Sequence, residues 1–369
     1  MNQENLKRVA KLLINHSLEL KENEKVFINA YAGAKNLVIE LLEEAYRIGA
    51  YPYVELNDNE VMKTFIKGAN VEQINIMNDW NMQRYKDVDA VIGIEGEEND
   101  AEFSEIPPEH FGKLVEATRS SNEFMENNRR WLIFKYPTPA NAQKAGMSTK
   151  AFEEFMFDVT ANVDYEKMAQ KITPLVELLE KTNKVRIVSP GTDLSFSIKD
   201  IPVVPCTGKR NVPDGEVYTA PVRDSVNGKI TYNTPSPYFG KTFKNVSLTF
   251  KNGKIVEADA DKPDEINQIF DTDEGARFVG EFAIGLNPKI AKPMGDILYD
   301  EKIAGSIHFT PGDAYKKADN GNKSQIHWDL VLIQTPEYGG GEIYFDDVLV
   351  RKDGSFVLSE LEGLNQVNL

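Results

Sequence analysis

The chain has 369 residues, which exceeds the size at which a single hydrophobic core stops growing, so two domains are expected. Hydrophobic residues make up 41% of the chain and charged residues 27%, as in an ordinary globular protein. The net charge of −16 argues against sequence-independent nucleic-acid binding, which needs a basic face, and it disfavours anionic membranes.

Signals for a compartment or a membrane are few. The single cysteine, Cys206, excludes an intrachain disulfide and fits a reducing compartment, and we interpret it as a buried structural thiol. The first residues have the pattern of a helix rather than of a secretory leader, and no apolar stretch approaches ~18 residues. We therefore expect a cytoplasmic protein that does not span a membrane.

The first half of the chain alternates between helical and strand-like patterns. Apolar residues recur at helical spacing over 1–20, 37–45 and 59–83. Strand-like runs cover 26–31, 53–56, 88–94 and 131–134. This alternation predicts parallel strands joined by right-handed crossovers, so the N-terminal region is expected to be an open α/β sheet.

The second half has a different pattern. Residues 148–182 are helical in pattern, with Pro174 as an expected break or kink. Short strand-like runs then follow, and the pairs Asn252-Gly253 and Asp353-Gly354 are hairpin signals. We place the domain boundary near 183, which gives an N-terminal α/β domain, 1–182, and a C-terminal domain, 183–369. The second domain should be mainly antiparallel β with a few helices, one of them at about 263–277.

Two of the four histidines, His308 and His327, lie within 20 residues of each other. The run 326–333 reads as a strand, so His327 and Asp329 would project from the same face as two ligands of one centre or as a ligand and its orienting partner. Taken alone, such a pair is more often a structural hydrogen bond, and His308 alone is more often a core histidine.

Two Gly-Glu pairs add carboxylates on an apolar background. Glu216 and Glu281 are flanked by apolar residues, and a carboxylate in such surroundings is costly to bury unless it is paired or bound to a metal. The preceding glycines leave room for another backbone or a ligand. A salt bridge to an arginine, such as Arg277 for Glu281, is the alternative. Together with the histidines and Asp329, these residues could hold a pair of zinc, cobalt or manganese ions that share a carboxylate.

Other catalytic signatures are missing from the sequence. It contains no Gly-x-Ser-x-Gly elbow, no His-Glu-x-x-His, no phosphate-binding loop and no Gly-x-Gly-x-x-Gly. The remaining histidines, His16 and His110, are interpreted as structural or exposed. The sequence therefore favours a metal site in its last 160 or so residues.

Several segments, in order, resemble the M29 family of metallo-aminopeptidases, the group of aminopeptidases T, S and PepS. They are 131–137, 145–148, 191–194, 211–221, 275–285, His308 with Gly312 and Tyr315, and the run from Asn322 to Asp329. The resemblance covers about 130–335 and extends more loosely to the N-terminal region. It implies that the metal ligands are Glu216, Glu281, His308, His327 and Asp329.

The resemblance also implies roles beyond ligation. Glu281 would bridge two ions and be catalytic, Tyr315 would be a weak ligand or a donor to the tetrahedral intermediate, and the protein would be a homodimer. There are departures from the family pattern: Phe309-Thr310-Pro311 follows His308 in place of a smoother apolar run, Asp313 replaces a residue that is often basic, and Glu301 is displaced by two positions.

The resulting hypothesis is a metal-dependent aminopeptidase that removes the N-terminal residue of peptides with two divalent ions per subunit. Peptides with a free N-terminus would be its substrates, and nucleic acids and membranes would not be partners. The alternatives are another dinuclear hydrolase, such as an amidase or dipeptidase, and a catalytically silent protein that binds metal or peptide.

Overall fold

The computed structural model describes residues 2–96, 98–99, 101–238 and 241–369. The chain divides into two compact units. The first comprises Met1–Asn162 and Gly208–Pro213, and the second comprises Val163–Thr207 and Asp214–Leu369.

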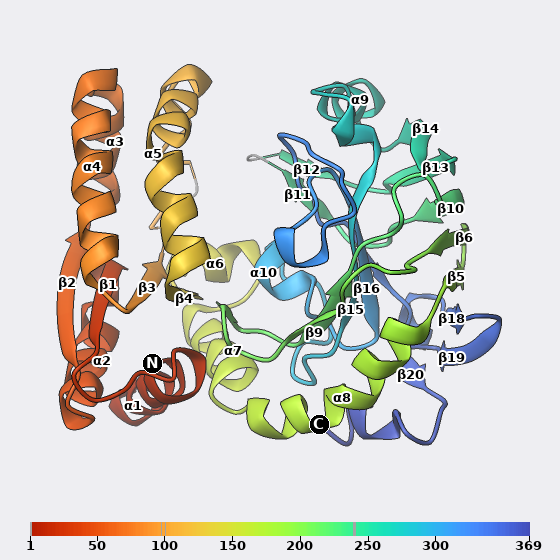
Figure 1. Ribbon diagram of the computed structural model, residues 1–369, viewed down its shortest axis with the longest axis horizontal. Coiled ribbons are helices and arrows are strands. Elements are labelled where there is room, and N and C mark those ends of the chain that lie inside the picture. The colour runs from red at the N-terminus through yellow and green to blue at the C-terminus, as the bar shows by residue number, and fades with distance from the viewer. Residues whose placement is uncertain (1, 97, 100, 239–240) are drawn as a thin grey trace. The chain divides into compact units, whose positions relative to one another are not determined.

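The first unit is built on one sheet of order β2-β1-β3-β4-β8, in which all neighbouring strands are parallel (Figure 1). Its strands are β1 (Lys25–Tyr31), β2 (Tyr51–Asn57), β3 (Ala90–Glu95), β4 (Arg130–Lys135) and β8 (Asn211–Val212). Its helices are α1 (Gln3–Lys11), which continues as a π-helix (Leu12–Ser17), α2 (Lys35–Arg47), α3 (Asn59–Gly68), α4 (Val71–Asp87), α5 (Pro108–Asn128), α6 (Pro139–Lys144) and α7 (Thr149–Thr160). The predicted open α/β sheet is confirmed.

Two of the predicted helical patterns each form two helices. The pattern over 59–83 forms two helices, α3 and α4, because the Asn70 side chain caps a new helix by accepting a hydrogen bond from the Gln73 amide. The pattern over 148–182 also forms two helices, α7 and α8 (Tyr165–Lys181). The break lies before Asp164, whose side chain caps α8, and Pro174 lies inside α8 without ending it.

Helix α8 groups with the second unit, whereas the sequence pattern placed the boundary near 183. The reason lies in its apolar face. Ile172, Leu175 and Leu179 are buried and belong to the large core of the second unit. Apolar periodicity alone does not indicate which core a helix covers. The boundary inferred from the sequence therefore lies at the end of α8, whereas the second unit begins before its start.

The second unit is mainly antiparallel, as predicted. Its large sheet has the order β14-β13-β10-β6-β5-β18-β19-β20, and a smaller one has the order β17-β16-β15-β9-β7. The strands of the large sheet are β5 (Lys184–Ser189), β6 (Thr192–Ser197), β10 (Asn227–Thr231), β13 (Ser247–Lys251), β14 (Lys254–Asp259), β18 (Glu342–Phe345), β19 (Val348–Lys352) and β20 (Ser355–Phe356). Those of the smaller sheet are β7 (Val204–Cys206), β9 (Glu216–Thr219), β15 (Val279–Gly285), β16 (Ser306–Pro311) and β17 (Val331–Ile333). A hairpin, β11 (Ser236–Tyr238) and β12 (Lys241–Phe243), and two further helices, α9 (Pro263–Phe270) and α10 (Ile297–Asp300), complete the unit.

Aromatic side chains join the large sheet and the smaller sheet of this unit. The ring of Phe196 on β6 lies 5.0 Å from that of Phe282 on β15 and 5.0 Å from that of Phe309 on β16. Each of these side chains is almost fully buried, and together they form the centre of one continuous core. One face of the smaller sheet therefore packs into the core, and the opposite face carries other side chains.

The hairpin turn that the sequence predicted at Asn252-Gly253 is present in the structure. Asn252 and Gly253 both have positive φ, 48° and 81°, in the hairpin between β13 and β14. The predicted helix over 263–277 is shorter, because α9 ends at Phe270 and only Gly275–Arg277 resumes as a 3-10 turn.

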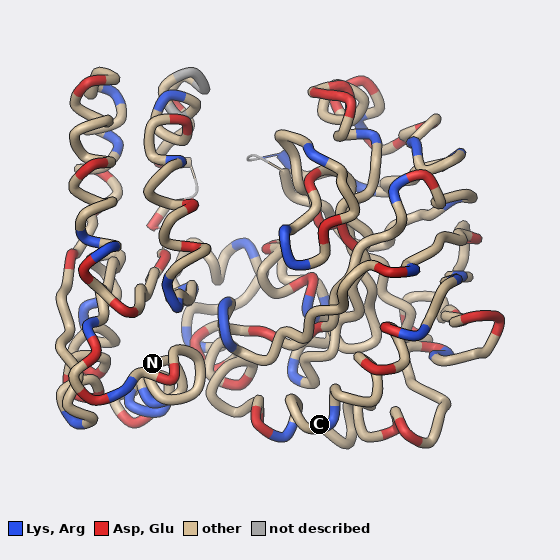
Figure 2. The backbone as a smooth tube through the Cα atoms, viewed as in Figure 1, with Lys and Arg blue, Asp and Glu red and all other residues tan. Residues whose placement is uncertain are grey.

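Charged residues of both signs are interspersed along both units (Figure 2). Among the described residues, no helix has the length and apolar content needed to cross a bilayer.

Candidate metal centre

The smaller sheet of the second unit positions three of the predicted residues. Glu216 opens β9, Glu281 lies on β15, and His308 lies on β16. The register pairs Gly285 with Glu216 and Ala283 with His308. Because residues directly opposite each other, and residues two apart on one strand, share a face, all three side chains project from one face of the sheet. The opposite face carries Phe282 and Phe309, which belong to the core.

A carboxylate at the centre faces both histidines. Oε1 of Glu281 lies 3.0 Å from Nε2 of His308, and Oε2 of Glu281 lies 3.4 Å from Nε2 of His327. Nε2 of His327 is also 3.3 Å from Oδ1 of Asp329. Oε2 of Glu216 is 3.5 Å from Nε2 of His308.

These side chains form two groups of potential metal ligands, and Glu281 belongs to both groups. One group is Glu216, Glu281 and His308, and the other is Glu281, His327 and Asp329. Within each group the donor atoms lie within 4.8 Å of one another. The structure thus brings together all five residues that the sequence singled out as ligands.

Hydrogen bonds from the outer side fix how each histidine points. Nδ1 of His308 lies 3.2 Å from the carbonyl oxygen of Glu301, and Nδ1 of His327 lies 2.8 Å from that of Asp313. A carbonyl oxygen only accepts, so each Nδ1 carries a proton and donates, which leaves Nε2 to face the carboxylates. Donation from the far nitrogen to a fixed acceptor is the arrangement that orients metal-binding histidines in proteins.

Gly280 leaves space for the backbone segment that orients His327. A Cβ atom at Gly280 would lie 2.1 Å from the carbonyl oxygen of Asp313, the oxygen that accepts from His327. No side chain could be accommodated there without moving that backbone. The glycine before Glu281 therefore leaves room for another backbone segment, as the sequence suggested.

His327 and Asp329 were expected on one strand, and that strand is shorter than predicted. Strand β17 begins at Val331, and His327 forms only an isolated bridge with Gly312. Irregular backbone bonds replace the ladder, from Trp328 to Pro311 and from Asp313 to Ile326. The two side chains nevertheless converge, and Thr310 on β16 donates a hydrogen bond of 2.7 Å to Oδ1 of Asp329.

The proximity of opposite charges shifts the proton affinities of these groups. Burial alone would lower the pKa of His308, but the carboxylates of Glu281 and Glu216 outweigh burial and raise it to about 9. Burial alone would raise the pKa of Glu281, but His308 and His327 outweigh burial and lower it. In the absence of another cation, the histidines hold protons that stabilise the carboxylates, and a metal ion would replace those protons.

Three buried polar atoms face this centre without a well-formed hydrogen bond. They are Oε2 of Glu216, Oε2 of Glu281 and Nε2 of His327. Buried polar atoms are almost always satisfied, so unsatisfied atoms that converge need a further partner. Imidazole nitrogen and carboxylate oxygen are both ligands that zinc, cobalt and manganese accept, and the residues fit a divalent ion.

Two further charged residues lie at the centre, and the sequence did not identify either of them as part of it. The sequence left Glu301 open, and the structure groups its carboxylate with His308 and Asp329. Lys302, which sequence reasoning missed, is 1% exposed, and its Nζ lies 2.6 Å from Oε1 of Glu216 and 2.6 Å from Oε1 of Glu301. Burial alone would lower the pKa of Lys302, but Glu216, Glu301 and Asp214 outweigh burial and raise it. In the sequence, Lys302 is marked only by its position directly after Glu301.

Tyr315 lies beside the centre. Its ring is 4.5 Å from the ring of His327 and 5.8 Å from the ring of Tyr218, measured between centroids. About half of Tyr315 is exposed, so the side chain borders both the centre and the solvent. His16 and His110 belong to the first unit.

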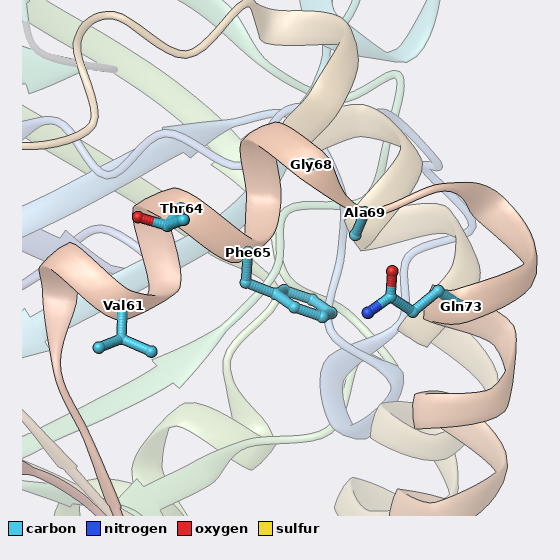
Figure 3. A pocket seen from close by; sticks show the side chains of 6 residues that line it. All are labelled: Val61, Thr64, Phe65, Gly68, Ala69 and Gln73. Carbon is cyan, nitrogen blue, oxygen red and sulfur yellow. The ribbon is translucent and has the colours of Figure 1, made fainter.

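A hollow in the first unit offers no comparable chemistry. It lies along α3 and the start of α4 (Figure 3), and it is lined by Val61, Thr64, Phe65, Gly68, Ala69 and Gln73. None of these lining residues is a titratable or metal-binding group. The chemistry of the described residues therefore concentrates on the small sheet of the second unit.

Comparisons with known proteins agree with this picture. The model of the thermophilic metalloprotease family M29 matches residues 2–355. Aminopeptidase T from Thermus aquaticus is 27% identical over 96% of this chain and 96% of its own length, and aminopeptidase 2 from Geobacillus stearothermophilus is 25% identical over 95% of both. The solved structure of wild-type AmpT from Thermus thermophilus, at 24% identity, superposes with a TM-score of 0.81 over 96% of this chain and 99% of that one, which shows the same fold.

Proposed function

The chain belongs to the M29 family of thermophilic metalloproteases, and on this premise we propose that it is a metal-dependent aminopeptidase with a dinuclear centre. Its substrates would be peptides with a free N-terminus, as the names of its relatives suggest. The observation that carries the proposal is the position of Glu281, whose two carboxylate oxygens face two different histidines.

The proposed ligands divide between two ions. Glu216 and His308 would hold one ion, His327 and Asp329 would hold the other, and Glu281 would bridge them. The unsatisfied atoms of Glu216, Glu281 and His327 support this division, because each ion would receive at least one of them. Glu301 is an additional candidate beside His308 and Asp329.

Divalent ions bound there would polarise the scissile carbonyl and lower the pKa of a water molecule towards neutrality. The protein's own contribution is to hold the ligands in place. Thr310 fixes Asp329, and the carbonyl oxygens of Glu301 and Asp313 fix the two histidines. Preorganisation of this kind removes the need to reorient ligands during the reaction.

Tyr315 would act on the substrate directly. Its ring is packed against His327 and Tyr218, so the hydroxyl is carried on a rigid support at the border of the centre. We assign it the role of donating a hydrogen bond to the oxyanion of the tetrahedral intermediate. We also assign a catalytic role to Glu281, because its carboxylate lies at the middle of the proposed metal pair.

Removal of metal tests the proposal. Protein stripped by a chelator should lose hydrolysis of aminoacyl-anilides, and added cobalt, zinc or manganese should restore it. Full activity in rigorously metal-free protein would exclude a metal-dependent mechanism. Substrates with blocked amino termini separate an aminopeptidase from an amidase, and peptide binding without turnover at full metal occupancy would indicate a silent binding protein.

We further propose a homodimer located in the cytoplasm. Strand β2 lies at the edge of its sheet, and Tyr51, Tyr53 and Leu56 on it are about half exposed, which is typical of an interface rather than of a free edge. The single cysteine fits a reducing compartment. Light scattering during size-exclusion chromatography would measure the mass, and Tyr53→Lys should shift it towards the monomer.

A further inference from the structure

Lys302 is a fully buried ammonium surrounded by carboxylates. Its Nζ lies 2.6 Å from Oε1 of Glu216, 2.6 Å from Oε1 of Glu301 and 3.9 Å from Oδ1 of Asp214. The side chain is 1% exposed. A charge so far from water is costly to bury unless opposite charges compensate for it, and here the opposite charges outnumber it.

The same place carries a further group of donors of the kind that bind metals. Cys206, Asp214 and Glu216 each offer an atom, and these atoms lie within 4.8 Å of one another. Two of the three, Asp214 and Glu216, are the carboxylates beside the lysine ammonium. Thiolate and carboxylate together form a ligand set that suits zinc. The lysine ammonium therefore lies beside donors that could otherwise bind a zinc ion.

The backbone holds Lys302 and its carboxylates in a fixed relation. The carbonyl oxygen of Lys302 accepts from the amide of Asn287, and the side chain of Asn287 donates to the carbonyl oxygen of Asp214. Asp300, two residues before Lys302, accepts hydrogen bonds from the amides of Met294 and Gly295. Both the segment that carries the ammonium and the segment that leads to Glu216 are therefore tied to one framework.

We propose that Lys302 is a positioning residue whose ammonium takes the place of a metal ion beside Cys206, Asp214 and Glu216. By holding Oε1 of Glu216, it leaves only Oε2 of that carboxylate to the proposed metal pair, and Oε2 is the oxygen 3.5 Å from His308. The inference rests on the proposed function for the neighbouring pair of ions. Its consequence is that the number of ions the chain binds is limited by the lysine as well as by the ligands.

Counting zinc ions tests this proposal. Wild-type protein and variants are stripped with a chelator, dialysed to equilibrium against zinc, and measured for zinc per chain by elemental analysis. Lys302→Ala removes the ammonium and opens its space, so it should bind one more zinc ion per chain than the wild type. Lys292→Ala, at an exposed lysine, is the matched control and should bind the wild-type number.

A double variant locates the additional ion. Lys302→Ala with Asp214→Asn removes one of the three donors, so the count should return to that of the wild type. An unchanged count in folded Lys302→Ala would overturn the proposal. Wild-type protein that bound no zinc would instead contradict the proposed function, and the difference between variant and wild type would still report on Lys302.

Stability provides a second readout if the loss of the ammonium weakens the fold. Lys302→Ser, whose hydroxyl can hold a water molecule between the carboxylates, should likewise bind one more zinc ion. In both variants zinc should raise the melting temperature by more than it does in the wild type, because an ion that binds only the folded chain stabilises it. Variants that fold at no zinc concentration would show that zinc cannot take the place of the ammonium, and would also overturn the proposal.

Discussion

Oε1 of Glu281 lies 3.0 Å from Nε2 of His308, on the same face of two adjacent antiparallel strands. The pairing is diagonal, since His308 is directly opposite Ala283 and Glu281 lies two residues before it. Diagonal neighbours across a sheet are within reach of long side chains. The sheet register therefore determines that this carboxylate and this imidazole meet, and Oε2 remains to face His327.

Replacing Glu281 by glutamine tests its central role. Glu281→Gln keeps the size of the side chain but removes its charge and one of its two ligand oxygens. We expect kcat/KM for aminoacyl-anilides to fall by more than about 100-fold, beyond what the loss of an outer partner of a metal ligand costs. Metal content per chain should fall as well, while the circular dichroism spectrum stays unchanged. Glu257→Gln, at an exposed glutamate on β14, is the control and should retain both activity and metal.

Thr310→Val tests the support of Asp329. Valine has nearly the same shape as threonine but cannot donate the hydrogen bond of 2.7 Å to Oδ1 of Asp329. Outer partners of metal ligands typically contribute about 10- to 100-fold in metal affinity, and we expect a loss in that range by competition with a chelator of known affinity. Thr242→Val, at an exposed threonine on β12, should change nothing. Equal affinities in wild type and Thr310→Val would show that Asp329 needs no such support.

Tyr315→Phe separates a catalytic hydroxyl from a structural ring. Phenylalanine preserves the packing against His327 and Tyr218, so metal content and KM should stay close to those of the wild type. If the hydroxyl donates to the oxyanion, kcat should fall by about 100- to 1,000-fold, as for the removal of one such donor. A fall in metal content with kcat per bound metal unchanged would instead make Tyr315 a ligand.

Alternation of side chains along a strand was the argument by which the sequence paired His327 with Asp329, and the structure shows the same alternation on two strands that the sequence had not assigned. The runs around Glu281 and His308 are strands, and their core-facing neighbours Phe282 and Phe309 alternate with the site residues. The pairing of His327 with Asp329 was right in outcome, although the strand that was expected to produce it begins only at Val331. Backbone hydrogen bonds to Pro311 and Asp313 hold that irregular segment instead.

The outer partners could not be predicted because they depend on tertiary contacts. Lys302 and Glu216 are far apart in sequence, and Asn287 ties the two segments that carry them together. The carbonyl oxygens that orient the histidines leave no trace in residue type at all. In the same way, the assignment of α8 to the second unit depends on which core its apolar face covers, and periodicity does not contain that information.

Asp273 connects the segment that leads to Glu281 with the segment that leads to His327. Its carboxylate accepts from the Ala276 amide at 2.9 Å, from the Ser324 hydroxyl at 2.8 Å and from the Gln325 amide at 2.7 Å. Asp273→Ala leaves these donors without an acceptor. We expect the free energy of unfolding at pH 7 to fall by about 1–3 kcal/mol, with reduced metal affinity because the His327 segment is loosened.

The pH dependence of that loss distinguishes hydrogen bonding by the carboxylate from simple packing. Burial opposes the shift, but the hydrogen bonds from Gln325, Ser324 and Ala276 lower the pKa of Asp273 below its ordinary value of 3.8. A carboxyl group with a lowered folded pKa contributes stability that is complete above the ordinary value and is lost as the pH falls through the folded value. The difference in unfolding free energy between wild type and Asp273→Ala should therefore be constant from about pH 5 to 8 and shrink below about pH 4. Urea unfolding at several pH values measures it, with Asp224→Ala, at an exposed aspartate whose contact with Arg223 is 3.7 Å long, as the control. A difference that stays the same down to acid unfolding would mean that Asp273 acts through packing and not through its charge.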